Sequence, residues 1–246
     1  MQSLLNAKMD WITETKIPIG KGAAAVFDWL QANGAWFFDG LAVVMEALID
    51  GVLWVLQTPH PFIIILAFTA LTYAIQRSWK VALFVVIGFL FILNQDYWEE
   101  TTESLPLVLS ACVVCMGVGV PIGIAMAHRP GLYRAARPVL DLMQTLPTFV
   151  YLIPAIVFFG IGMVPGLIAT VIFVLPAPIR LTHLGVTSTP TPLLEAADAF
   201  GATPSQKLWK VELPSALPQI MPGFNQTIML SLSMVGIAAL VGASGL

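Results

Sequence analysis

The sequence predicts an all-α protein: a polytopic membrane helical bundle with an amphipathic interfacial helix near its N-terminus. Of the 246 residues, 58% are hydrophobic and only 10% are charged, and the mean hydropathy is +0.87. Soluble domains are about 45–50% apolar and about 25% charged, so a globular fold of this length could not bury so much apolar surface. Long uncharged runs also recur along the chain, separated by short polar segments.

Several apolar runs, uncharged except for Asp141 near the start of one of them, approach or exceed the length of a membrane-spanning helix, which is about 20 residues with a lower limit of about 17. They are Pro61–Gln76, Val81–Leu93, Leu105–Ala127, Pro138–Met163, Val164–Ile179 and Gln219–Leu246. The loops between them are alternately rich in Lys and Arg and free of both. The positive-inside rule therefore predicts that the basic loops are cytoplasmic and that the N-terminus lies outside.

Residues 23–56 show a different pattern, because they are apolar but carry four acids. At 100° per residue, Asp28, Asp39, Glu46 and Asp50 fall within roughly 40° of one another on a helix. Moving four acids across a bilayer unaided would cost on the order of 10 kcal/mol. A helix lying in the plane of the interface avoids this cost, and we favour it over a helix that crosses with its acids packed inward. Asn33-Gly34 is a candidate break.

Other function classes lack support in the sequence. The net charge of −3 excludes a basic surface for nucleic acid. The sequence shows no metal-ligand spacing, so no metal site is expected. It also shows neither a cluster of catalytic side chains nor a Walker-type phosphate loop, so we do not expect an enzyme.

The last basic loop is the most structured one. Thr191 is the expected N-cap of a short helix with Pro192 at its first position, and Gly201 ends this helix, since glycine accepts the left-handed conformation at a helix C-terminus. Thr203 and Gln206 form a capping-box pattern that begins a second helix. Leu213-Pro214 is expected to end that helix, which gives a helix–turn–helix projecting from the membrane.

The same loop carries a family resemblance. Glu195-Ala196-Ala197, three residues, Gly201, nine residues and then Val211-Glu212-Leu213-Pro214 resembles the EAA loop of ABC-importer permeases, with Val211 where the consensus has Ile. The segments Pro138–Pro147, Phe149–Pro154 and Asn225–Met234 are similar to permeases of glycine betaine, proline betaine and choline importers. The resemblance covers the chain from about residue 25 onward.

This resemblance implies the transmembrane permease subunit of an ATP-driven importer of quaternary amines, in the cell inner membrane, with the loop on the cytoplasmic side. The loop would dock on a separate ATPase subunit, which would bind ATP and Mg, so the chain itself needs no cofactor. The expected coupling residues are Glu195, Ala196, Ala197, Gly201, Leu213 and Pro214. The other implied partners are an external substrate-binding protein, a second permease copy in a homodimer, and membrane lipid.

We expect three regions. Residues 1–57 form the N-terminal tail and amphipathic helix, 58–100 form two accessory spans, and 101–246 form the core permease domain with a coupling loop at 186–218. Members of the family continue past residue 246, so the sequence is expected to be truncated at its C-terminus.

The candidate gating or pathway residues are Asp141, Pro147, Tyr151 and Pro154. For Asp141, an ion pair with Arg137 at the helix end is favoured over a contact with substrate. Two alternative functions stay open: an ABC-importer permease for another small solute such as an amino acid, and a secondary transporter. A secondary transporter would favour intramembrane ion ligands, and the predicted spans are nearly free of acids.

Overall fold

The computed structural model describes residues 19–240 and 242–243, which contain helices and no strand. The chain divides into two compact units, residues 1–41 and 42–246, and α2 (Ile19–Gln57) begins in the first and ends in the second. The all-helical fold predicted from the sequence is confirmed. The N-terminal tail predicted before residue 19 lies outside the described residues.

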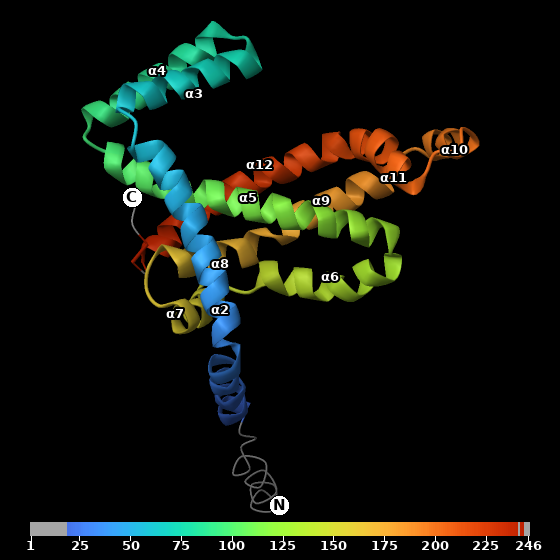
Figure 1. Cartoon of the computed structure of the whole chain (residues 1–246), viewed down its shortest axis with the longest axis horizontal. Coiled ribbons are helices and arrows are strands. Elements are labelled where there is room, and N and C mark those ends of the chain that lie inside the picture. The colour runs from blue at the N-terminus through green and yellow to red at the C-terminus, as the bar shows by residue number, and fades with distance from the viewer. Residues whose placement is uncertain (1–18, 241, 244–246) are drawn as a thin grey trace, which may run out of the picture. The chain divides into compact units, whose positions relative to one another are not determined.

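The second unit continues through eleven further helical segments (Figure 1). They are α3 (Pro61–Gln76), α4 (Trp79–Asn94), α5 (Trp98–His128), α6 (Pro130–Thr145), α7 (Phe149–Phe159), α8 (Met163–Val174), α9 (Pro176–Thr187), α10 (Thr191–Ala199), α11 (Pro204–Lys207), the π-helical η1 (Leu208–Glu212) and α12 (Leu213–Ala239).

In the first unit, α2 runs without interruption through Asn33-Gly34, so the candidate break is wrong. The Asn33 side chain donates to the carbonyl of Trp29, 2.9 Å away and one turn earlier. An asparagine that bonds along its own helix no longer competes with the helical backbone. The placement of this helix in the membrane interface stays a prediction.

Three helical stretches of the described chain are long and apolar enough to cross a membrane: Trp98–His128, Met163–Thr187 and Pro204–Ala239. α3 and α4 are apolar but have 16 residues each, slightly short of a full span. They pack on each other as a hairpin, which Figure 1 shows. The second expected span is therefore somewhat longer than Val81–Leu93 and begins at Trp79.

The span expected at Pro138–Met163 is not one continuous helix. Two helices, α6 and α7, occupy this region and meet at an angle of 93°. Leu146, between them, has extended backbone angles (φ −71°, ψ 140°). A residue that precedes proline is driven out of the helical region by the proline ring, so Pro147 forces this corner. The pair is either a broken span or a re-entrant segment.

α9 lies at the centre of the second unit, packed between α5 and α12 (Figure 1). Glycines stand at these crossings. A Cβ on Gly123 of α5 would meet the Ile179 carbonyl and the Thr182 side chain of α9, each at 2.7 Å. A Cβ on Gly185 of α9 would lie 3.0 Å from Ala216 of α12. Side chains at these positions would push the helices apart, and close approach through small residues is how membrane helices associate.

We predict that Gly123→Ala destabilises the folded protein by about 1–3 kcal/mol, because the new methyl group collides with backbone that cannot move aside. Gly117→Ala is the matched control in the same helix, since a Cβ at Gly117 would have no neighbouring atom within 4 Å. That variant should be neutral or slightly stabilising, because alanine is the better helix former. Thermal unfolding of the two variants in detergent tests this, and equal midpoints would contradict it.

Candidate functional site

The first helix of the predicted loop, α10, ends in a complete Schellman motif. The N–H of Gly201 donates to the Asp198 carbonyl at 3.0 Å, and the N–H of Ala202 donates to the Ala197 carbonyl at 3.0 Å. Gly201 has φ +71°, the left-handed conformation that this motif requires and that glycine adopts without strain. The predicted stop at Gly201 is confirmed. α10 begins one residue earlier than expected, because Pro190 is the N-cap and Thr191 is the first helical residue.

The second helix begins with the predicted capping box. The Gln206 N–H donates to the Thr203 hydroxyl at 3.3 Å, and the Thr203 N–H donates to the Gln206 side chain at 3.0 Å. Lys207 Nζ then lies 2.7 Å from both carboxylate oxygens of Asp198 in α10. This bidentate ion pair ties the two helices of the loop together.

The second helix does not end at Leu213-Pro214, which corrects the sequence prediction. The chain passes through the π turn η1 and continues as α12, so that Pro204–Ala239 is one helical stretch. The Leu213 N–H donates to the Leu208 carbonyl, five residues back. Pro214 follows directly after this π turn, so the proline, which has no N–H, stands where the hydrogen-bond register of the helix changes.

A groove on the loop is lined mainly by apolar side chains, together with Lys210 and Ser215. Ala196, Ala197 and Pro214, three of the expected coupling residues, line it together with Leu193 and Phe200. Phe200 is 92% exposed, and Leu193 and the nearby Trp209 are also exposed. Of the remaining coupling residues, Glu195 and Gly201 are exposed and Leu213 is half-buried, and none of these lines the groove. The exposed aromatic residues were not singled out from the sequence.

The base of the loop is attached to the transmembrane helices. Val186, Ala216 and Ile220 form a buried cluster against which Leu213 packs. Beside it, Nε2 of His128 at the end of α5 lies 2.9 Å from a carboxylate oxygen of Glu212. Glu212 is 6% exposed and stands within the sequence motif, between Val211 and Leu213.

The candidate pathway residues gather around the corner between α6 and α7. Asp141 binds Arg180 of α9 at 2.6 Å, so its ion-pair partner is not Arg137 as favoured from the sequence. Pro147 forms the exposed corner, and the Tyr151 hydroxyl donates to the Leu142 carbonyl at 3.0 Å across it. Pro154 lies inside α7. The structure gives Asp141 and Tyr151 structural contacts, and their role in a pathway stays a prediction.

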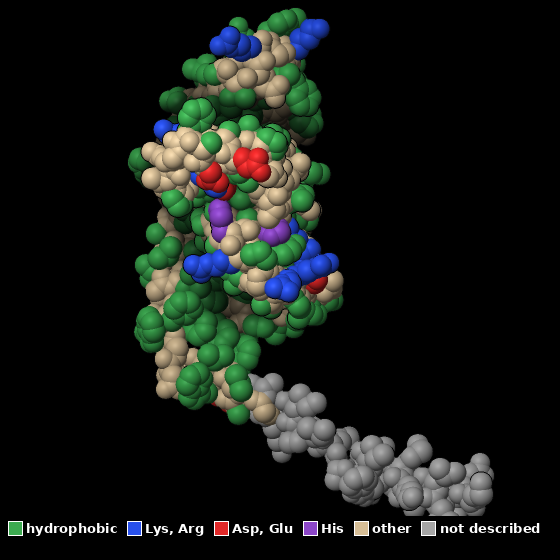
Figure 2. Space-filling view, turned by 90° about the vertical axis from the view of Figure 1, so that its right-hand side faces the viewer, with side chains coloured by type: hydrophobic (Ala, Val, Ile, Leu, Met, Phe, Trp, Pro, Cys, Tyr) green, Lys and Arg blue, Asp and Glu red, His purple; other side chains and the backbone are tan. Residues whose placement is uncertain are grey.

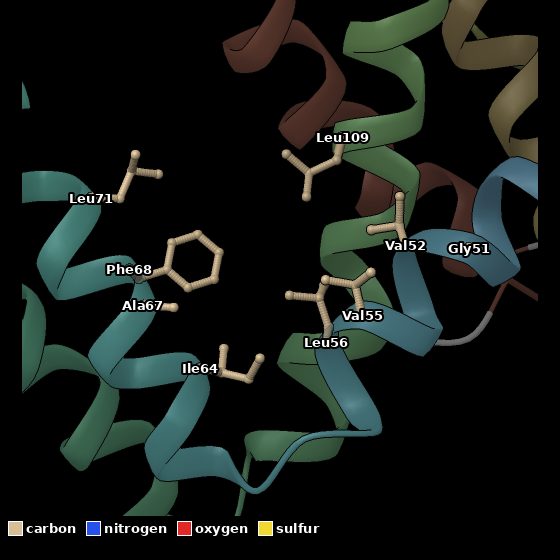
Figure 3. A pocket seen from close by; sticks show the side chains of 9 residues that line it. All are labelled: Gly51, Val52, Val55, Leu56, Ile64, Ala67, Phe68, Leu71 and Leu109. Carbon is tan, nitrogen blue, oxygen red and sulfur yellow. The ribbon is translucent and has the colours of Figure 1, made fainter.

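Other pockets lie elsewhere in the second unit, and two of them are lined by residues between 42 and 56 of α2. One, of about 380 Å³, is lined by hydrocarbon side chains of α2, α3 and α5, among them Leu56, Phe68 and Leu109 (Figure 3). It offers no polar group to orient a charged solute. The second is lined by Glu46 and Asp50 of α2 together with Phe159 and the start of α8. Two of the four acids of α2 therefore face a protein pocket.

Comparison with known proteins decides the family. The family model of the binding-protein-dependent transport system inner membrane component matches residues 119–246. The glycine betaine/carnitine transport permease protein GbuB of Listeria monocytogenes serotype 1/2a is 46% identical, over 94% of this chain and 82% of its own length. The chain belongs to this family. The permease is also 45% identical to the glycine betaine transport system permease protein OpuAB of Bacillus subtilis, over 94% of this chain and 82% of that protein.

A solved structure agrees with the fold. An inward-facing structure of the MetNI methionine ABC transporter superposes with a TM-score of 0.53 at 25% identity, over 64% of this chain and 78% of that chain. The family expected from the EAA-type loop is thus confirmed. The permease is a multi-pass inner membrane protein with a transport role, in a family whose partners are an ATPase and a substrate-binding protein.

We predict that Gly201→Ala loosens the loop by about 1–2 kcal/mol, because alanine is strained in the left-handed conformation. No neighbouring atom lies within 4 Å of the added methyl group, so the effect comes from the backbone alone. Gly201→Asn, which tolerates this conformation better, is the conservative control. Hydrogen exchange of residues 191–212, followed by mass spectrometry, should be faster in the alanine variant, and unchanged exchange would contradict the prediction.

Proposed function

We propose that this permease forms the membrane pathway of an ATP-driven importer of quaternary amines such as glycine betaine, proline betaine or choline. The observation that carries the proposal is similarity over nearly the whole chain to two permeases whose names specify glycine betaine. An external binding protein delivers the amine, and the permease works as a homodimer. ATP and Mg are bound by the partner ATPase.

The groove on the loop supports ATPase docking. It combines small residues, Ala196 and Ala197, which permit close approach, with the exposed ring of Phe200. Exposed aromatic side chains beside a shallow groove are typical centres of protein–protein binding energy. The Schellman turn, the capping box and the Lys207–Asp198 pair hold this surface in one shape. A preformed surface loses less entropy on binding.

Charge supports a cytoplasmic loop. Figure 2 views the molecule from the side on which Figure 1 shows α10 and α11, and Lys, Arg and His side chains gather there. The loop joining α5 to α6 and the first turns of α6 contribute Arg129 and Arg134, and both are exposed. By the positive-inside rule this face lies in the cytoplasm, where the ATPase is.

A second substrate class has one observation in its favour, the structural similarity to a methionine transporter. Uptake into proteoliposomes that contain the permease, its ATPase and its binding protein distinguishes a quaternary-amine importer from a methionine importer. We expect ATP-dependent accumulation of labelled glycine betaine that unlabelled choline or proline betaine reduces and methionine does not. Accumulation of methionine in place of glycine betaine would refute the amine assignment.

We predict that Phe200→Glu reduces copurification of the ATPase subunit by at least about tenfold, since a charge then replaces an apolar anchor at the groove. Phe200→Tyr keeps the aromatic surface and should retain binding. Both variants should remain in the membrane fraction at wild-type amounts, because the side chain is almost fully exposed. Equal recovery of the ATPase with both variants would show that the groove is not its docking surface.

A further inference from the structure

The open pocket between α2, α3 and α5 is lined by hydrocarbon alone. In Figure 3, Phe68 and Leu71 of α3 stand across the opening from Val52 of α2 and Leu109 of α5. None of the lining residues has a polar side chain, and Leu71 and Leu109 are exposed although they face the pocket. The pocket has a volume of about 380 Å³. An apolar cavity of about 150 Å³ already binds small apolar molecules, so this space is large enough for a ligand.

The helices around this pocket are joined to one another near one end of α5. The side-chain amide of Gln57, at the end of α2, donates to the Thr102 hydroxyl of α5 at 3.3 Å. The ring of Phe89 in α4 lies 5.5 Å from that of Phe68 in α3 and 6.2 Å from that of Trp98 in α5, between centroids. Otherwise α3 and α4 pack mainly on each other. The hairpin is therefore attached near the start of α5, and the pocket lies farther along both α3 and α5.

The pocket lies at the depth of the bilayer interior. Trp98 begins α5, which is long and apolar enough to cross a membrane, and tryptophan is typical of the membrane–water interface. Leu109 stands eleven residues farther along this helix, which is about 16 Å at about 1.5 Å per residue. The hydrocarbon core of a bilayer is about 30 Å thick. The pocket therefore opens at the level of the lipid chains, in the half of the bilayer on the side of Trp98.

The size of the pocket favours a lipid chain over a protein helix. A helix about 10 Å across occupies roughly 400 Å³ with each turn of about 5.4 Å. The pocket is slightly smaller than one such turn, so a helix of a partner or of a second permease copy does not fit into it. Water is also a poor occupant, because an apolar cavity stays dry. A single flexible hydrocarbon chain is narrow enough to enter, and it reaches the opening directly from the surrounding bilayer.

We propose that this pocket binds one acyl chain of a membrane phospholipid, which fills the space between the α3–α4 hairpin and α5. Phe68 and Leu109 contact the chain from opposite sides, and Val52 and Val55 contact it from α2 (Figure 3). The chain gives the hairpin dispersion contacts that the side chains of the protein do not supply. The attachment of the hairpin to the rest of the second unit therefore depends on bound lipid, whichever substrate the permease carries.

A phosphatidylcholine that carries a photoreactive diazirine in one acyl chain tests the site. The whole permease chain is reconstituted in phosphatidylcholine vesicles containing this lipid, extracted in a mild detergent and washed until bulk lipid is removed. Illumination then labels only the lipid that the protein retains, and mass spectrometry locates the adducts. We expect adducts on Phe68, Leu71 and Leu109. Few should form on Phe84 of α4 or Met229 of α12, although both side chains are more exposed than the three in the pocket.

A double variant, Gly51→Phe with Ala67→Phe, fills the pocket with protein. A Cβ at Gly51 would have no neighbouring atom within 4 Å, so the new ring has room. We expect pocket adducts to fall by at least about tenfold, because a chain that no longer fits loses its dispersion contacts. Added phosphatidylcholine should raise the unfolding temperature of wild type in detergent but not that of the variant. Gly117→Leu, at an exposed position of α5 outside the pocket, is the matched control and should behave as wild type.

Several results would overturn the proposal. Adducts distributed in proportion to exposure, with no excess at the pocket, would show only bulk lipid. Equal labelling of the pocket residues in wild type and in the filled variant would place the chain elsewhere. Absence of pocket adducts in wild type would show that no chain is retained. If the filled variant then also lost association between permease copies in native mass spectrometry, side chains of a second copy would be the occupant instead.

Discussion

In a bilayer every backbone N–H and C=O must find its partner within the protein, and a helix satisfies this requirement by itself. The helix that begins at Pro204 does not stop at Leu213-Pro214 but continues to Ala239. A loop whose second helix ended at this proline would be joined to the membrane by a flexible link. The π turn directly precedes Pro214, and the helix continues through it although the proline has no N–H to donate. The loop and α12 therefore share one continuous helical backbone.

A continuous helix transmits force only if its far portion is held by the core. α12 is packed on α9, and α9 on α5, at crossings where glycine allows close contact. Gly223 of α12 lies close to Leu181 of α9, as Gly185 lies close to Ala216. Because close-packed interiors shift between discrete arrangements rather than deform continuously, a force on the loop is expected to move these helices together.

The sequence predicted the helical membrane fold, the family and the local form of the loop. Gly201 and the Thr203–Gln206 box could be interpreted because helix ends depend on a few neighbouring residues. The predictions that were wrong concern positions where tertiary structure outweighs local sequence preferences. Pro147 was expected to lie within a span but makes a 93° corner, whereas Pro214 was expected to stop a helix and does not. Both residues restrict the backbone, but the surrounding hydrogen bonds decide the result.

Contacts between charged side chains far apart in the sequence could not be inferred from the sequence. Arg180 lies 39 positions from Asp141, and His128 lies far along the chain from Glu212, so no helical spacing indicates either contact. Asp141 was paired with Arg137 because only neighbours on one helix are visible to a sequence pattern. The exposure of Phe200 was equally hidden, since an apolar residue in a short helix is as readily buried as exposed.

The distance between the loop and the middle of α12 tests the central claim most directly. Spin labels at Ser205 and Leu232, both exposed, would be placed in a chain whose Cys112 and Cys115 are replaced by serine. They should lie about 40 Å apart along the helix. We predict the same distance distribution with the ATPase free and with the ATPase closed on nucleotide, because loop and helix move as one body. A distribution that shifts or broadens on nucleotide binding would show that the helix bends between the two labels, and would contradict the account.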